Sequence, residues 1–266
     1  MSGRLALVTG ASSGIGAALA RVYASHGYDL ALTARREDRL ASLADELRLR
    51  HGVESLVIPA DLARPEAPAE ILAQIEANGR VVDALVNNAG YSLPGAYAAT
   101  RWEDQQAFLQ VLVMAVSELA HRVLPGMLER RFGRIVNVAS LAGLMPGSLG
   151  HTLYGPAKAY VVRFSQGLHI ETQGTGVHVS ALCPGLTYSE FHDVDGSRAQ
   201  ISEQTPAWMW LGADEVAQAG YEAAEAGRPL CVTGAPNKAI AAFAKLIPDE
   251  WAMALMASQM GRFRRV

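Results

Sequence analysis

Apolar and polar positions along the chain follow two alternating patterns. Short apolar runs predict strands buried on both faces, at residues 5–8, 30–33, 56–58, 84–86, 134–138, 177–182 and 230–232. Apolar residues three or four positions apart predict the helices between them, at about 15–26, 37–51, 65–78, 102–130, 153–172 and 214–226. Repeated alternation of strands and helices indicates parallel strands joined by right-handed crossovers. We therefore expect an α/β fold, a doubly wound parallel sheet of about seven strands with helices on both faces.

Two segments fall outside this alternation. Residues 184–212 lack clear periodicity and contain the apolar stretch Trp208-Met209-Trp210, which suits either a hydrophobic substrate wall or the core. Residues 239–260 are apolar at helical spacing, which predicts core packing or a subunit contact. We see no linker or internal repeat, so we interpret residues 1–266 as one domain in which 186–212 covers the substrate.

Composition narrows the class of protein. Half of the 266 residues are apolar and the net charge is −3, which gives no reason to expect a nucleic acid partner. No apolar run reaches the length of a membrane span and the first residues lack signal-peptide features, so we expect a cytoplasmic protein. Cys183 and Cys231 stand in strand-like apolar runs, which predicts buried thiols, and the scattered histidines predict no metal site.

A glycine-rich stretch, Thr9–Gly16, connects the first strand to the first helix. Glycines there permit a tight turn and a close approach of the backbone to a ligand. The helix that follows offers free N–H groups and a positive dipole end to a pyrophosphate. We expect a dinucleotide to contact the following residues of this loop: Gly10, Ser12, Ser13, Gly14, Ile15 and Gly16.

The residues after the second strand bear on cofactor choice. An acidic residue at this place would bind the ribose hydroxyls of NADH. The chain has Arg35 and Arg36 there, with Glu37 as the nearest acid. Because a guanidinium matches a phosphate, we predict NADP(H) in preference to NAD(H), with Arg35 as the main contact to the 2′-phosphate. The alternative is that both arginines are only solvated at a helix start.

With these features and several further motifs, the chain resembles the short-chain dehydrogenase/reductase family over almost its full length. The motifs occur in the family's order: Thr9–Gly16, Asp61-Leu62, Asn87-Asn88-Ala89-Gly90, Ser140, Tyr154-x-x-x-Lys158 and Pro184-Gly185. The resemblance implies a Rossmann-like fold and hydride transfer between a nicotinamide and a ketone, aldehyde or secondary alcohol. It also implies a homodimer or homotetramer formed through the fourth and fifth helices.

The resemblance assigns further cofactor contacts. Asp61 and Leu62 would lie against the adenine. Asn88, Ala89 and Gly90 would line the cofactor at the end of the fourth strand. The nicotinamide would be embraced by a segment that follows the sixth strand, and its members are Pro184, Gly185, Leu186, Thr187 and Ser189.

The predicted acid–base chemistry lies with Tyr154 and Lys158. They stand four residues apart on one predicted helix and so share a face. Tyrosine has an ordinary pKa of about 10, and a nearby ammonium favours its phenolate form. By resemblance, Lys158 also binds the nicotinamide ribose, and Ser140 holds the substrate oxygen beside Tyr154. Taken without the other motifs, Tyr154 and Lys158 fit a surface pair on a helix better than a catalytic pair, and the alternative for Ser140 is a strand-end cap.

One position departs from the family pattern. Many members carry an asparagine in the fourth helix that holds a water linking the lysine to solvent, and here that position is Leu112. Either the proton relay takes another route or turnover is slow. An alternative is therefore a non-catalytic NADPH-binding sensor or scaffold. The Ser–Tyr–Lys set argues against a third possibility, an epimerase or dehydratase.

The substrate pocket is expected beside Ser140 and Tyr154. The Ser140–Tyr154 separation is one residue longer than is usual in the family, which we interpret as one extra residue in the loop 145–151. The expected pocket walls lie near this loop and after the fourth strand, at Tyr91, Leu93, Leu144, Met145 and His151.

Overall fold

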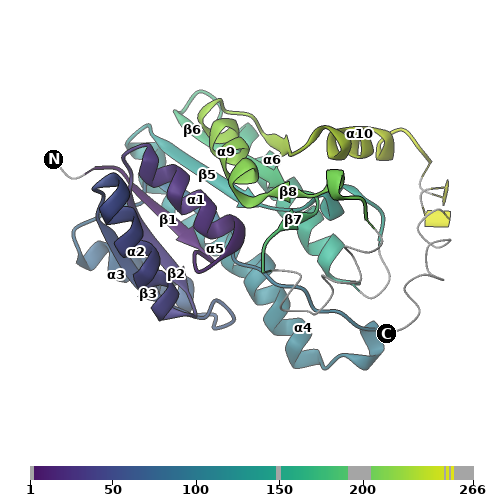
Figure 1. The fold of residues 1–266 in the computed structure, drawn as a ribbon, viewed down its shortest axis with the longest axis horizontal. Coiled ribbons are helices and arrows are strands. Elements are labelled where there is room, and N and C mark those ends of the chain that lie inside the picture. The colour runs from purple at the N-terminus through teal and green to yellow at the C-terminus, as the bar shows by residue number, and fades with distance from the viewer. Residues whose placement is uncertain (1–2, 148–150, 191–204, 249, 252, 255–266) are drawn as a thin grey trace.

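A seven-stranded parallel sheet forms the centre of the protein (Figure 1). The computed structural model describes residues 3–147, 151–190, 205–248, 250–251 and 253–254. The strand order is β3-β2-β1-β4-β5-β6-β9, which confirms the predicted fold class. The strands are β1 (Leu5–Thr9), β2 (Asp29–Ala34), β3 (Ser55–Pro59), β4 (Ala84–Asn87), β5 (Gly133–Val138), β6 (Val177–Cys183) and β9 (Leu230–Val232).

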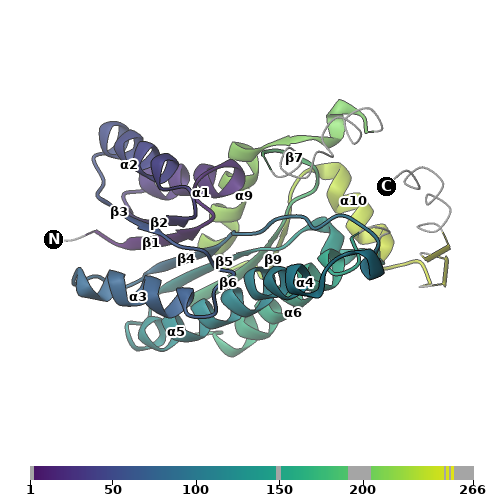
Figure 2. The same cartoon turned by 90° about the horizontal axis from the view of Figure 1, so that it is seen from below.

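Helices cover both faces of the sheet (Figure 2). One layer holds α1 (Gly14–Ser25), α2 (Glu37–His51) and α9 (Ala213–Glu225). The other holds α3 (Ala67–Ala77), α4 (Trp102–Leu109), α5 (Ala115–Glu129) and α6 (Tyr154–Glu171). Within β1, Ala6 and Val8 pack in the first layer, whereas Leu5 and Leu7 pack in the second. Burial on both faces explains why each central strand is continuously apolar.

The predicted long helix at 102–130 is interrupted. A π-helical turn, Gln110–Met114, separates α4 from α5, and the periodicity gave no sign of it. The stretch Trp102–Glu129 is long and apolar enough to cross a membrane by length and composition alone. However, Phe108, Leu112 and Leu119 on it are at most 1% exposed and belong to the core beneath the sheet. The stretch therefore has the features of a core helix.

The aperiodic segment after β6 contains a second, small ladder. β7 (Thr187–Tyr188) pairs with β8 (Leu211–Gly212), and a short helix, Ala207–Met209, precedes β8. Trp210 is buried and stacks on Tyr188, whereas Trp208 is exposed. Residues 191–204 lie outside the described residues, so the covering role of 186–212 remains a prediction.

Near the end of the described chain lies α10 (Ala235–Ala244), whose second half overlaps the apolar stretch 239–260. Residues 249, 252 and 255–260 of that stretch lie outside the described residues. Both cysteines are free thiols: Cys183 is buried as expected, but Cys231 is only partly buried because it stands on the edge strand β9.

Candidate active site

The glycine-rich loop forms a narrow cradle between β1 and α1. Gly10 and Gly14 adopt φ angles of +66° and +55°, which side chains rarely tolerate. A Cβ on Gly16 would overlap the Gly10 carbonyl oxygen and Asn88 Nδ2. The backbone can therefore come close to a ligand at the start of α1, which fits the pyrophosphate of a dinucleotide.

Asn88 holds two strand ends together. Its Nδ2 donates to the Thr9 carbonyl oxygen at 2.9 Å. Thr9 Oγ1 in turn accepts from the backbone N–H groups of Asn88 and Ala89, at 2.9 and 3.0 Å. These bonds fix the carboxyl ends of β1 and β4 beside each other, at the point where the strand order reverses. Open α/β sheets bind ligands at such a point.

Arg36 lies over the glycine-rich loop. Its guanidinium donates to Ser12 Oγ and Ser13 Oγ, with a shortest distance of 3.0 Å to each. It also pairs with Glu190, at 2.8 Å. Arg35, the residue expected to be the main phosphate contact, is exposed. The arginine that the structure brings to the loop is thus Arg36.

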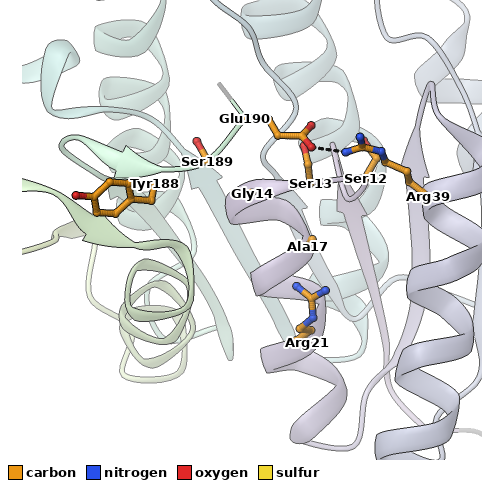
Figure 3. Close-up of a pocket in the computed structure, with 9 residues that line it drawn as sticks. All are labelled: Ser12, Ser13, Gly14, Ala17, Arg21, Arg39, Tyr188, Ser189 and Glu190. Atoms are coloured by element: carbon orange, nitrogen blue, oxygen red, sulfur yellow. Dashed lines mark hydrogen bonds and ion pairs between the residues drawn. The ribbon is translucent and has the colours of Figure 1, made fainter. Parts of the chain in front are cut away.

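A cavity of about 450 Å³ opens beside this loop (Figure 3). Arg39 and Glu190 line it and form an ion pair across it. Neither residue was expected from the sequence. Arg39 lies one helical turn beyond Arg35, a signal that could have been used, but no local pattern connects Glu190 to residues about 150 positions earlier. The lining residues are Ser12, Ser13, Gly14, Ala17, Arg21, Arg39, Tyr188, Ser189 and Glu190.

Ser140 follows β5 and faces the loop after β6. Its Oγ accepts from the backbone N–H of Ala142 at 3.1 Å, so its own proton is not used in this bond. The neighbouring Leu141 N–H donates to the Pro184 carbonyl oxygen at 2.8 Å. The ends of β5 and β6, which carry Ser140 and Pro184, are thereby joined.

Tyr154 and Lys158 lie on the first turns of α6. Lys158 is 6% exposed, and its Nζ donates to the Val138 carbonyl oxygen at 2.8 Å. Nζ lies 5.8 Å from the centre of the Tyr154 ring. Burial lowers the pKa of Lys158 from 10.5 to about 8. The structure thus places a buried ammonium, anchored at β5, beside the tyrosine.

Leu112 lies close to this lysine. A Cβ placed on Gly90 would be 3.8 Å from both Leu112 Cγ and Lys158 Nζ. Leu112 is 1% exposed and stands in the π-helical turn. At the position where many family members place an asparagine, an apolar side chain therefore packs near the lysine.

The segment after β6 contacts both the glycine loop and β8 (Leu211–Gly212). Thr187 Oγ1 donates to the Gly185 carbonyl oxygen at 3.1 Å, and Leu186 accepts from the backbone N–H of Leu211. A Cβ on Gly14 would be 2.9 Å from Ser189 Cβ. A dinucleotide on the loop would therefore meet this segment as well.

Asp61 and Leu62, the predicted adenine contacts, also make contacts within the fold. Asp61 follows β3, and its Oδ1 accepts from the backbone N–H of Ala63 at 3.0 Å. Leu62 is 7% exposed and packs in the core layer of α3 and α5.

Of the expected pocket walls, Tyr91 and His151 make contacts with neighbouring residues. Ser92 Oγ lies 3.1 Å from His151 Nδ1, and the Tyr91 ring meets Phe108 edge to face. Met145 lines a separate apolar cavity of about 390 Å³ with residues of the apolar stretch 239–260, which was expected to pack in the core or against a subunit. These are Ala239, Ile240, Phe243, Ala244 and Ile247.

Comparison with known proteins agrees with this geometry. Residues 4–199 match the family model described as short chain dehydrogenase. A curated relative, sulfoacetaldehyde reductase 2 from Chromohalobacter salexigens, is 36% identical over 222 residues, covering 80% of this chain and 85% of that protein.

Solved structures of similar fold carry either nicotinamide dinucleotide. A short-chain dehydrogenase from Sphingobium yanoikuyae in complex with NADPH has a TM-score of 0.78 and 30% identity, covering 99% of this chain and 96% of that one. A short-chain dehydrogenase/reductase from Burkholderia phymatum in complex with NAD has a TM-score of 0.79 and 28% identity, covering 90% and 92%. The chain belongs to the short-chain dehydrogenase/reductase family of oxidoreductases.

Proposed function

We propose that the protein is an NADP(H)-dependent oxidoreductase that interconverts a ketone or aldehyde and the corresponding alcohol, with Tyr154 as general acid and base. The observation that carries this proposal is the placement of Lys158, a buried ammonium beside the Tyr154 ring that is fixed by Val138. A bound nicotinamide would supply the hydride. The residues of the chain would bind the cofactor, orient the substrate and transfer a proton.

In the reducing direction, Tyr154 donates its phenolic proton to the substrate oxygen. The nearby positive charge of Lys158 stabilises the phenolate that remains. Ser140 donates its hydroxyl proton to the same substrate oxygen, since its Oγ is already held from the other side by the Ala142 N–H. The reverse reaction uses the same groups, with Tyr154 as the base.

The proposed preference for NADP(H) rests on the cationic residues beside the glycine loop. Arg36 presents a guanidinium there and bonds to two serine hydroxyls of the loop. Arg35 is exposed on the same turn and adds charge. A 2′-phosphate would meet both arginines, and we assign Arg36 the larger share because its position is fixed. The NADPH complex of the Sphingobium yanoikuyae relative supports this choice.

The test follows NADPH and NADH absorbance in mixtures of the purified chain with a panel of aromatic and aliphatic ketones and aldehydes. We expect NADPH consumption, and a loss of kcat of at least about 100-fold in Tyr154→Phe, because the proton donor is removed. Cofactor binding by the variant, measured by fluorescence, should persist.

Tyr97→Phe is a matched control, since Tyr97 is an exposed tyrosine in the short helix Tyr97–Ala99. Full activity in Tyr154→Phe would contradict the proposed role. NADPH binding without turnover of any compound would favour a non-catalytic sensor, the function that the apolar Leu112 would suit.

We also propose a homo-oligomer formed through the face of α4, α5 and α6. Trp102, Met114, Tyr160 and Ile170 are each more than 40% exposed on these elements and the turn between them. Tyr160 also stacks on Phe164 of the same helix. Light scattering gives the mass in solution, and a monomer at micromolar concentration would contradict this assembly.

A further inference from the structure

Glu190 bridges two arginines at the edge of the cofactor cavity. One carboxylate oxygen lies 2.8 Å from Arg36 Nη1, and the other bonds to Arg39 Nη1. Figure 3 shows the bond to Arg39 reaching from the segment after β7 towards α2, above the loop that contains Ser12 and Ser13. A single side chain therefore connects two parts of the fold that are separate in sequence.

The groups around this carboxylate are hydrogen-bond donors. Besides the two guanidiniums, the Ser12 and Ser13 hydroxyls lie within 3.0 Å of Arg36 Nη2. Guanidiniums and hydroxyls at the start of a helix form a typical binding environment for a phosphate. Among the described residues of this cluster, the negative charge that the arginines meet belongs to Glu190.

The contact is part of the cofactor site. Ser189, the preceding residue, approaches Gly14 so closely that a Cβ there would be 2.9 Å from Ser189 Cβ. Ser189, Glu190 and Arg39 line the same cavity as the glycine loop. The carboxylate therefore lies where the phosphates of a dinucleotide would approach.

The Glu190 carboxylate and a 2′-phosphate are both anions and would compete for the guanidiniums of Arg36 and Arg39. Hydrogen bonds from Arg39 and Arg36 hold the pKa of Glu190 down at about 2, so the group is ionised at neutral pH. A 2′-phosphate carries up to two negative charges and would meet the same guanidiniums. Two anions at hydrogen-bond distance from one guanidinium repel each other.

We propose that Glu190 determines cofactor selectivity by occupying the anion position of Arg36 and Arg39, from which the 2′-phosphate of NADPH must displace it. This inference rests on the proposed function. NADH has a ribose hydroxyl in place of the phosphate and leaves the ion pairs in place. The net preference for NADPH is therefore smaller than the arginines alone would give.

The test measures dissociation constants of NADPH, NADH and adenosine 2′,5′-bisphosphate for the wild type, Glu190→Gln and Glu190→Ala. The bisphosphate presents the 2′-phosphate without a nicotinamide. We expect both substitutions to tighten NADPH and the bisphosphate about five- to tenfold, because the two partly exposed ion pairs no longer have to be broken. NADH affinity should change less than about twofold.

Asp38→Asn is the matched control. It removes one negative charge from α2 next to Arg39, and no hydrogen bond or ion pair of Asp38 to either arginine is present in the described part of the chain. Its NADPH affinity should stay within about twofold of the wild type. An equal gain in this control, or an equal gain for NADH, would show a general charge effect and overturn the proposal.

Two other outcomes of these binding measurements would contradict the proposal. Unchanged or weaker NADPH binding in both Glu190 variants would mean that the ion pairs close over the bound cofactor, and the proposal would be wrong. A wild-type chain that binds neither dinucleotide would overturn the proposed function together with this inference. A chain that binds NADPH without the expected gain would overturn the inference alone.

Discussion

At the scale of single residues, Lys158 joins a positive charge to almost complete burial. Gly143 packs so closely on the Lys158 backbone that a side chain at position 143 would overlap it. Its Nζ is anchored by the Val138 carbonyl oxygen of β5. Burial of the charge opposes folding, and the lowered pKa is the measure of that cost.

Stability should therefore rise with pH just above neutrality. The pKa of Lys158 is about 8 in the folded chain and about 10.5 in an unfolded one, so between these values the unfolded chain binds more protons. From pH 7.5 to 9 the wild type should gain about 1 kcal/mol relative to Lys158→Met, by urea unfolding. The measurement ends at pH 9 because burial raises the pKa of the Cys183 thiol to about 12. Above pH 9 this thiol loses its proton more readily in the unfolded chain, which lowers stability.

Lys238→Met is the control for this measurement, since Lys238 is a lysine elsewhere on the chain whose side chain is not buried. It should show the same pH dependence as the wild type. A wild type that runs parallel to Lys158→Met through this range would show that Lys158 does not titrate there.

At the scale of elements, the helical stretch under the sheet is shaped by its π-helical turn. The turn Gln110–Met114 holds Leu112 against Gly90 and near Lys158. π-helical turns in general often occur at functional sites. Here the turn presents an apolar side chain, so the described residues around Lys158 offer no side-chain amide at this point.

We expect Leu112→Asn to cost stability without a large gain in turnover. A buried leucine is replaced by an amide with few partners, which should lower the free energy of unfolding by about 2–4 kcal/mol. The kcat should stay within about threefold of the wild type, because the Ser140, Tyr154 and Lys158 groups are unchanged. Urea unfolding and steady-state kinetics measure the two effects.

Leu112→Met is the matched control, since it keeps the volume and apolar character and should cost less than about 1.5 kcal/mol. A tenfold rise of kcat in Leu112→Asn alone would show that proton supply limits the native chain. In that case the apolar residue would be the cause of slow turnover.

At the scale of the whole molecule, the proposed cofactor contacts come from elements that fold around several strands. The glycine loop follows β1, Asn88 follows β4, Ser140 follows β5 and Pro184 follows β6. A ligand that contacts all of them binds only the folded chain, so it should stabilise the fold as a unit.

NADPH at about 100 times its dissociation constant should therefore add about 2.7 kcal/mol and raise Tm by about 5 °C. Arg36→Ala should lose most of the NADPH effect and keep most of that of NADH, because the proposed partner of the guanidinium is the 2′-phosphate, which NADH lacks. Arg35→Ala is the companion variant in the same thermal scans. A larger loss in Arg35→Ala than in Arg36→Ala would return the main phosphate contact to Arg35.

The sheet, its main helices and the order of the motifs could be predicted from the residues in order along the chain. Each central strand is buried on both faces, so its apolar run is unbroken and easily read, and glycines mark the turn at Thr9–Gly16. Helical spacing places Tyr154 and Lys158 on one face, because positions four apart share a face, and the resemblance to the family supplies their role. Local rules suffice for these features.

Contacts between groups far apart in the sequence became visible in the folded chain. Arg36 rather than Arg35 lies over the loop because of how the chain turns between β2 and α2, and Glu190 reaches it from 154 residues away. The π-helical turn and the burial of Lys158 likewise depend on the packing of Leu112, Gly90 and β5. Such contacts depend on the three-dimensional course of the chain, which no local pattern of residues encodes.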